Sequence, residues 1–271
     1  MKIRGSTIVI TGASRGIGLA TARAVARVGG RVALLARSSE VEQIAAQIVH
    51  GGGDARAYMV DLADPGAVER VGQQIKNDLG APDIVINNAG AGRWLLVEET
   101  SPDEAAAMMA SPYLAAFYIT RLFLPAMIER RQGYIVNVNS PAAWLSWPGA
   151  TGYTAARWAM RGFTAALRAD LRGTGVQVLQ VVPGKVSSTY FEHNPHSEER
   201  IPAITRVIPV LTPDEVAAAV VRGIMNDRRE IVIPALMRAT LIAHALAPIL
   251  VDWLMFRTGW RRSPTKPTNR G

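Results

Sequence analysis

Three glycines near the amino terminus have the spacing of a site for a phosphate group. Gly12, Gly16 and Gly18 follow a β-branched, apolar run at 7–10 and precede an apolar-periodic run that ends at Gly29. This pattern predicts a buried strand, a tight turn and then a helix. The first N–H groups of a helix lack intrahelical partners, and glycines let an anion approach the backbone. We therefore interpret the segment as a nucleotide site, with a plain turn as the alternative.

Two arginines stand where a dinucleotide-binding fold recognises the adenosine ribose. The predicted second strand, residues 31–36, is followed by Arg37, and Arg15 lies within the glycine segment. An acidic residue at such a strand end accepts from the ribose 2′-hydroxyl, whereas guanidinium groups bind a 2′-phosphate. The pair favours NADP(H) over NAD(H). The alternative is that both arginines are solvated surface residues.

The rest of the chain alternates strands with helices. Further strands are predicted at 55–60, 83–86, 134–138, 175–182 and 231–233, and helices at 40–49, 65–79, 102–129, 153–172 and from Thr212 onward. This alternation predicts an α/β fold with a doubly wound parallel sheet and ligands at the carboxyl ends of its strands. Pro112 removes one helical N–H, so we expect a kink within 102–129.

Polar residues follow the third and fourth predicted strands. Asp61 could accept a hydrogen bond from an adenine amino group, or simply begin the turn before Pro65. The amides of Asn87 and Asn88 can tie neighbouring strand ends together and shape a cofactor floor. As a bare dipeptide, the two asparagines would indicate only a turn.

Length and composition narrow the class of protein. A chain of 271 residues suits one α/β domain with a large core. It contains no cysteine, which excludes disulfides and cysteine-based zinc sites, and no metal is expected. Residues 257–271 carry five of the net +8 charges, so no nucleic-acid partner is expected. The amino terminus enters the first strand without an apolar signal run, which predicts a cytoplasmic protein.

Taken together, these motifs resemble the short-chain dehydrogenase/reductase family. The matching pieces are T-G-A-S-R-G-I-G at 11–18, N-N-A-G at 87–90, Ser140, Tyr153 thirteen residues later, and P-G at 183–184. The resemblance covers about residues 7–234. It implies a Rossmann-type sheet of about seven strands and hydride exchange between a nicotinamide and a carbonyl or alcohol carbon. The cofactor-binding residues expected in this way are Gly12, Ser14, Arg15, Gly16, Ile17, Gly18, Arg37, Asp61, Leu62, Asn88, Ala89, Gly90, Tyr153, Arg157, Pro183, Gly184, Val186 and Ser188.

The resemblance also assigns the catalytic hydroxyls. Tyr153 would be the general acid or base, and Ser140 would hydrogen-bond the same substrate oxygen. A free tyrosine titrates near pH ~10, so an adjacent cation is needed to make a phenolate accessible. Without the family, Tyr153 would be a half-buried tyrosine at a helix start, and Ser140 a strand-end hydroxyl.

Two positions depart from the family pattern. The family has Tyr-x-x-x-Lys, whereas this chain has Y-T-A-A-R, which places Arg157 on the helix face of Tyr153. A guanidinium supplies the charge but cannot pass a proton onward. The family's catalytic asparagine falls on Pro112. We expect an active but atypical NADP(H)-dependent reductase whose protons come directly from solvent. The alternative is a catalytically impaired NADP(H)-binding sensor or scaffold.

A polar stretch at 185–211, interrupted by prolines, is a candidate lid over the substrate. Within it, Ser188 or Thr189 would bind the nicotinamide carboxamide by resemblance, and His193 and His196 are expected to be solvated. Aromatic residues around the pocket mouth favour an apolar carbonyl or alcohol substrate, such as a lipid, steroid or long-chain compound. They are Trp94, Trp144, Trp147, Tyr190 and Phe191, and core or subunit packing explains them nearly as well.

Beyond Pro234 the resemblance ends, which divides the chain into a catalytic domain at 1–234 and an extension at 235–271. The extension is apolar but contains Arg238, His244 and Asp252, so a transmembrane helix is not expected. One interpretation is an amphipathic helix with a basic tail on the inner membrane surface. The other is a helix packed on a partner subunit or over the active site. Family habit implies a homodimer or homotetramer.

Overall fold

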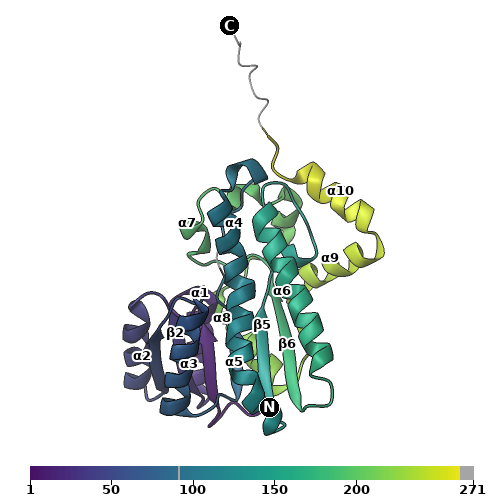
Figure 1. The fold of residues 1–271 in the computed structure, drawn as a ribbon. Coiled ribbons are helices and arrows are strands. Elements are labelled where there is room, and N and C mark those ends of the chain that lie inside the picture. The colour runs from purple at the N-terminus through teal and green to yellow at the C-terminus, as the bar shows by residue number, and fades with distance from the viewer. Residues whose placement is uncertain (91, 263–271) are drawn as a thin grey trace.

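A seven-stranded parallel sheet with helices on both faces forms the body of the protein (Figure 1). The computed structural model describes residues 1–90 and 92–262. The strand order is β3-β2-β1-β4-β5-β6-β7, which confirms the predicted Rossmann-type α/β fold. The strands are β1 (Thr7–Thr11), β2 (Arg31–Ala36), β3 (Asp54–Met59), β4 (Ile84–Asn87), β5 (Gly133–Val138), β6 (Val176–Pro183) and β7 (Glu230–Ile233).

Alternate side chains of the strands pack into two separate cores, one on each face of the sheet. Ile8 and Ile10 of β1 pack beneath α1, α2 and α8, whereas Val9 faces α3, α5 and α6 on the opposite side. This alternation follows from the two-residue period of a strand buried on both faces. The α-helices are α1 (Gly16–Arg27), α2 (Glu40–His50), α3 (Pro65–Leu79), α4 (Pro102–Met109), α5 (Ala115–Glu129), α6 (Thr151–Asp170), α7 (Tyr190–His193), α8 (Pro213–Met225), α9 (Ala235–Leu246) and α10 (Pro248–Thr258).

The predicted kink is present between α4 and α5. Residues 110–114 form a π-helical turn, and Ser111, just before Pro112, has the non-helical angles φ −139° and ψ 113°. The residue before a proline is pushed out of the helical region, which explains the break. The run Pro102–Glu129 is long and apolar enough to cross a membrane by composition. Ile119 and Phe123 are nevertheless fully buried against the sheet, so it is a core helix of this fold.

The carboxyl-terminal extension is two helices where the sequence suggested one. Helix α9 ends at Leu246, Ala247 adopts φ −141° and ψ 65°, and Pro248 begins α10. The proline explains the break, because it disfavours a helical conformation at the preceding residue. The two helices contact each other as a hairpin, and α9 lies beside β7. The predicted basic tail beyond Arg262 lies outside the described residues.

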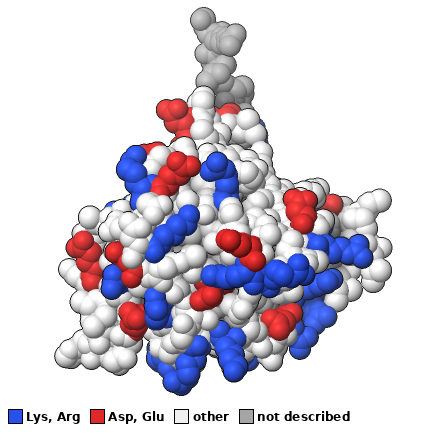
Figure 2. Space-filling model, turned by 60° about the horizontal axis from the view of Figure 1, so that its bottom comes forward, with Lys and Arg blue, Asp and Glu red and all other residues white. Residues whose placement is uncertain are grey.

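Surface charges of both signs are mixed on the face seen in Figure 2. Exposed charges of opposite sign form pairs in this structure, such as Arg56 with Asp78 and Arg121 with Glu69. Such exposed pairs contribute little to stability, about 0–1 kcal/mol each. The free energy of folding therefore rests mainly on the two buried cores.

Phe123→Ala should lower the free energy of unfolding by about 3–5 kcal/mol, because Phe123 is fully buried between α5 and the sheet. Phe117→Ala on the same helix is the matched control. Phe117 is 40% exposed, and its loss should cost only about 1 kcal/mol. Chemical denaturation measures both values. Equal losses in the two variants would contradict the assignment of the core.

Candidate active site

The glycine segment adopts the geometry that an anion site needs. Gly12 has φ +65°, and a Cβ atom there would lie 2.9 Å from the Cα atom of Ala89. A Cβ on Gly18 would collide with the carbonyl oxygen of Gly12. Arg15 precedes α1 without capping it through its side chain, so the first N–H groups of α1 are left for another acceptor. These residues fit the phosphates of a dinucleotide.

Asparagine amides tie the carboxyl ends of the central strands together, as predicted. The Asn88 side-chain amide donates to the Thr11 carbonyl oxygen at 3.0 Å, and the Thr11 hydroxyl accepts from the Asn88 backbone at 2.9 Å. The Asn87 amide donates to Asn137 on β5 at 2.9 Å and to Thr120 on α5 at 3.1 Å. This network fixes β1, β4 and β5 at the edge where the ligand cleft opens.

A single cleft of about 1290 Å³ runs along the carboxyl edge of the sheet. It brings together every predicted cofactor residue except Gly18, which is buried beneath the turn. The lining includes Gly12, Ser14, Arg15, Gly16, Ile17, Arg37, Asp61, Leu62, Asn88, Ala89, Gly90, Pro183, Gly184, Val186 and Ser188. The sequence interpretation missed Ser38, Leu145, Met237 and Met255, which also line the cleft. Ser38 directly follows Arg37, so the strand-end argument could have included it.

The residues expected to recognise the adenosine end are open to solvent. Arg15 and Arg37 are both exposed and both line the cleft. Asp61 accepts a hydrogen bond from the Ala63 backbone at 3.0 Å through Oδ1, which makes it a turn residue. It also lines the cleft, and the expected hydrogen bond from an adenine amino group stays a prediction.

The three predicted catalytic residues, Ser140, Tyr153 and Arg157, all line this cleft. Tyr153 is buried, with 6% of its surface exposed. The Ser140 hydroxyl oxygen accepts from the Ala142 backbone at 3.3 Å, which leaves its own proton free to donate. The guanidinium carbon of Arg157 lies 5.0 Å from the Tyr153 ring centroid. The i, i+4 spacing therefore places the cation against the phenol, as the sequence indicated.

Arg157 carries a buried charge that the described residues satisfy only in part. It is 7% exposed, its Nη1 donates to the Val138 carbonyl at 3.2 Å, and its Nε has no partner among the described residues. A Cβ on Gly90 would lie 2.7 Å from Arg157 Nη2, so the glycine makes room for the larger head group. A buried N–H donor without a partner, such as Arg157 Nε beside the cleft, fits a site in which a bound polar ligand accepts the hydrogen bond.

Trp94, Trp147, Tyr190 and Phe191 line the cleft, as expected, and pack around Tyr153. The Trp94 ring lies 5.0 Å from Trp147, 5.4 Å from Tyr153 and 5.8 Å from Phe191, and Trp94 is only 6% exposed. The Tyr190 hydroxyl donates to the Gly92 carbonyl at 2.7 Å. Burial, together with the nearby Tyr153, raises the pKa of Tyr190, which keeps this hydroxyl protonated.

Trp144 does not belong to this group. It is absent from the lining of the cleft, and its ring instead lies under Arg161, whose guanidinium carbon is 4.6 Å from the ring centroid. The expectation that Trp144 contacts substrate is therefore wrong. Arg161, one helical turn beyond Arg157, stacks its guanidinium on the indole ring of Trp144 and so occupies the face that a substrate would contact.

The segment 185–211 covers the cleft as irregular chain with short helical turns. Arg200 anchors it: its Nη2 pairs with Glu99 Oε2 at 2.8 Å, and its guanidinium carbon lies 4.9 Å from the Trp260 ring centroid. The Leu96 backbone N–H and Arg200 hold the pKa of Glu99 below its usual range, so this anchor stays charged at neutral pH. His193 and His196 are exposed, as expected.

Comparison with known proteins agrees with this site. The family model for short chain dehydrogenases matches residues 6–199. The ketoacyl reductase HetN of Nostoc sp. is 33% identical, and the match covers 92% of this chain and 88% of that protein. The 17-beta-hydroxysteroid dehydrogenase 13 of Rattus norvegicus is 32% identical, with 91% and 80% covered.

A solved structure shows the same fold. The alcohol dehydrogenase from Thermococcus sibiricus, complexed with 5-hydroxy-NADP, superposes with a TM-score of 0.74 at 28% identity, over 84% of this chain and 95% of that one. The protein therefore belongs to the short-chain dehydrogenase/reductase family of oxidoreductases, which confirms the resemblance found in its motifs.

Arg157→Met should weaken NADPH binding by ~10-fold, because it removes the charged donors at the inner end of the cleft. The same variant should lower the free energy of unfolding of the ligand-free protein by less than about 1 kcal/mol, because a buried, partly unpaired charge adds little to stability. Fluorescence titration and chemical denaturation measure the two effects. A variant that unfolds readily but binds NADPH normally would show that Arg157 is a structural residue.

Proposed function

We propose that this protein is an NADP(H)-dependent reductase of apolar carbonyl compounds. The observation that carries the proposal is that Ser140, Tyr153 and Arg157 line the same cleft as the glycine turn, with the Arg157 guanidinium carbon 5.0 Å from the Tyr153 ring centroid. When bound, the nicotinamide supplies or accepts the hydride. The protein has to orient it, hold the substrate oxygen and move one proton.

Each of the three residues has a distinct role in this proposal. Tyr153 gives a proton to the carbonyl oxygen during reduction, and Ser140 donates a hydrogen bond to that oxygen as negative charge develops. Arg157, stacked against the phenol ring, stabilises the phenolate that remains. Because a guanidinium does not release its proton, water entering the cleft restores the proton on Tyr153 directly.

The choice of NADP(H) rests on Arg15 and Arg37, which are exposed at the adenosine end of the cleft. Two guanidinium groups favour a 2′-phosphate. The binding of 5-hydroxy-NADP by the related alcohol dehydrogenase supports this choice.

The substrate end of the cleft favours an apolar molecule. Leu145, Ile201, Met237 and Met255 line it together with the aromatic residues around Tyr153. The names of two relatives, a ketoacyl reductase and a hydroxysteroid dehydrogenase, support an acyl or steroid-like compound.

We place the protein in the cytoplasm, at a membrane surface where such compounds reside, as a homodimer or homotetramer. The division into domains at 1–234 and 235–271 belongs to the same proposal.

Tyr153→Phe should lower kcat for reduction of a soluble aliphatic ketone by at least ~100-fold and leave NADPH affinity within about threefold, because only the proton donor is lost. Arg157→Lys, measured in parallel, should leave kcat unchanged or raise it, because it restores the residue type of the family. NADPH oxidation followed at its absorbance band gives both rates. Unimpaired turnover by Tyr153→Phe would remove that hydroxyl from the mechanism.

Arg37→Asp should exchange the cofactor preference. A carboxylate at this strand end repels a 2′-phosphate and accepts from a 2′-hydroxyl, so NADPH affinity should fall by ~10-fold or more while NADH affinity rises. Arg23→Asp, an exposed change on α1 outside the cleft, controls for net charge. Equal weakening by both variants would mean that Arg37 acts only through the overall charge.

A second candidate is a sensor or scaffold that binds NADP(H) without turning it over. Two observations favour it: Arg157 in place of the family lysine, and Pro112 with its π-helical turn in place of the catalytic asparagine. The presence of both Ser140 and Tyr153 in the lining of the cleft supports the reductase more strongly.

A further inference from the structure

The hairpin of α9 and α10 exposes an uninterrupted apolar apex. Residues 245–250 are all exposed and all apolar, with Leu246 at 81% and Ile249 at 86%. Trp253 and Phe256 on α10 are each 52% exposed. In Figure 1 these helices project from the side of the molecule. A contiguous apolar patch of this kind marks a surface that contacts something other than water.

The charges on the two helices and just beyond them are almost all positive. Arg238, Arg257 and Arg261 are exposed, and the Arg257 guanidinium carbon lies 5.4 Å from the Trp253 ring centroid. Arg262 pairs with Glu98 at 2.7 Å. The sole acid within 235–262, Asp252, pairs with His244 at 3.2 Å. Apolar side chains flanked by arginine and tryptophan suit the boundary between lipid head groups and acyl chains, and the net positive charge suits anionic lipid.

A second copy of this chain is a poorer occupant of the same surface. Contact between identical hairpins across a two-fold axis would bring two copies of the same basic surface together. Like charges facing each other across an interface are unfavourable, and no exposed acid of the hairpin would offset them. An anionic bilayer satisfies both the apolar apex and its basic flanks.

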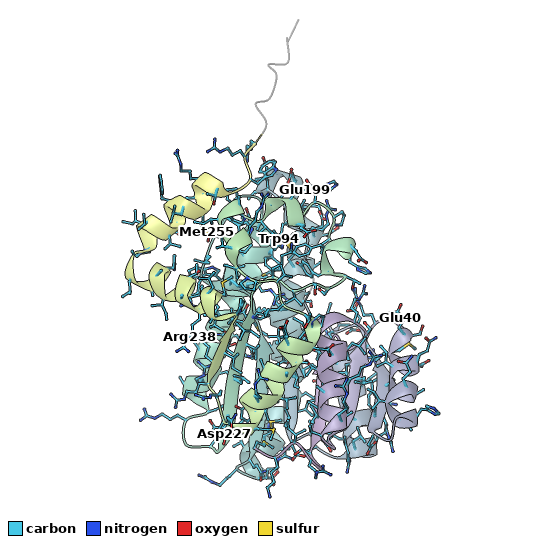
Figure 3. The ribbon with its side chains drawn as sticks, turned by 180° about the vertical axis from the view of Figure 1, so that it is seen from behind. Glu40, Trp94, Glu199, Asp227, Arg238 and Met255 are labelled. Atoms are coloured by element: carbon cyan, nitrogen blue, oxygen red, sulfur yellow. The ribbon has the colours of Figure 1, made fainter. Side chains whose placement is uncertain are left out.

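The inner side of the same hairpin forms a wall of the active-site cleft. Met237 of α9 and Met255 of α10 line the cleft, and Val251 is buried beside them. In Figure 3, Met255 lies between α10 and the part of the protein that carries Trp94. Just beyond α10, Trp260 stacks on Arg200 of the covering segment 185–211. The hairpin therefore has one side in the cleft and the other available for lipid.

We propose that the α9–α10 hairpin inserts its apex, residues 245–250, into an anionic membrane surface and that the substrate passes from the bilayer into the cleft beside Met237 and Met255. The passage of the substrate into the cleft rests on the proposed reductase function, whereas the insertion of the apex into the membrane does not. Docking keeps an apolar substrate out of water along its whole path. It also explains why the exposed and cleft-lining apolar residues lie on opposite sides of one pair of helices.

Co-sedimentation of the full-length protein with vesicles tests the docking. Vesicles of equal parts phosphatidylglycerol and phosphatidylcholine should bind the protein, and pure phosphatidylcholine vesicles should bind it much less. Ile249→Glu with Leu250→Glu should weaken binding to the anionic vesicles by ~10-fold or more. The matched control, Val49→Glu with Met225→Glu on α2 and α8, adds the same charge at exposed positions and should bind normally.

Turnover assays on the same variants separate docking from catalysis. The Ile249→Glu, Leu250→Glu variant should reduce a soluble short-chain ketone at the wild-type rate and should lose ~10-fold or more on a long-chain ketone carried in anionic vesicles. Binding to vesicles with no turnover of either ketone would refute the reductase and leave the docking intact. Failure of the wild-type protein to bind anionic vesicles would overturn the docking. It would also be overturned if the Ile249→Glu, Leu250→Glu variant changed its oligomeric state but still bound the vesicles.

Discussion

The contact between Arg157 and Tyr153 is the interaction on which the active site depends. It places a permanent positive charge 5.0 Å from the centre of the phenol ring, at a position where both side chains are more than nine-tenths buried. In such a region the charge acts on the phenol with little screening by water. The neighbouring elements serve this contact: β5 provides the Val138 carbonyl that holds the guanidinium, and Gly90 after β4 leaves space for it.

The site accommodates arginine in place of the family lysine. The planar head group needs more room than an ammonium group, and Gly90, which belongs to the family motif, has no Cβ to obstruct it. The proline that replaces the family asparagine still breaks the long helix, through a π-helical turn whose Ser111 lines the cleft. The site therefore keeps the two features of the family, a distorted helix and a cation beside the tyrosine, although Pro112 and Arg157 provide them in place of asparagine and lysine.

Much of this arrangement could be predicted from the sequence, because strong local signals coincide with the fold. The apolar runs placed each strand within one residue of its observed bounds, and the helix predicted from Thr212 onward is α8, which begins with a capping box at Thr212. The spacing of the family motifs predicted that Ser140, Tyr153 and Arg157 lie together, and all three line one cleft. The cleft-lining Met237 and Met255 could not be assigned in this way, because the residues around them come from distant parts of the chain, and the position of Trp144 depends on a contact with Arg161 that no motif marks.

The central claim is that this buried constellation moves a proton while a hydride is exchanged. Its most direct test is a single-turnover measurement: the protein, saturated with NADPH, is mixed in a stopped-flow instrument with an excess of an apolar ketone, and the nicotinamide fluorescence is followed in water and in deuterium oxide. The account predicts complete loss of fluorescence, with a slower rate in deuterium oxide because proton transfer from Tyr153 accompanies the reaction. Bound NADPH that keeps its fluorescence against a panel of aliphatic, acyl and steroid ketones would contradict it.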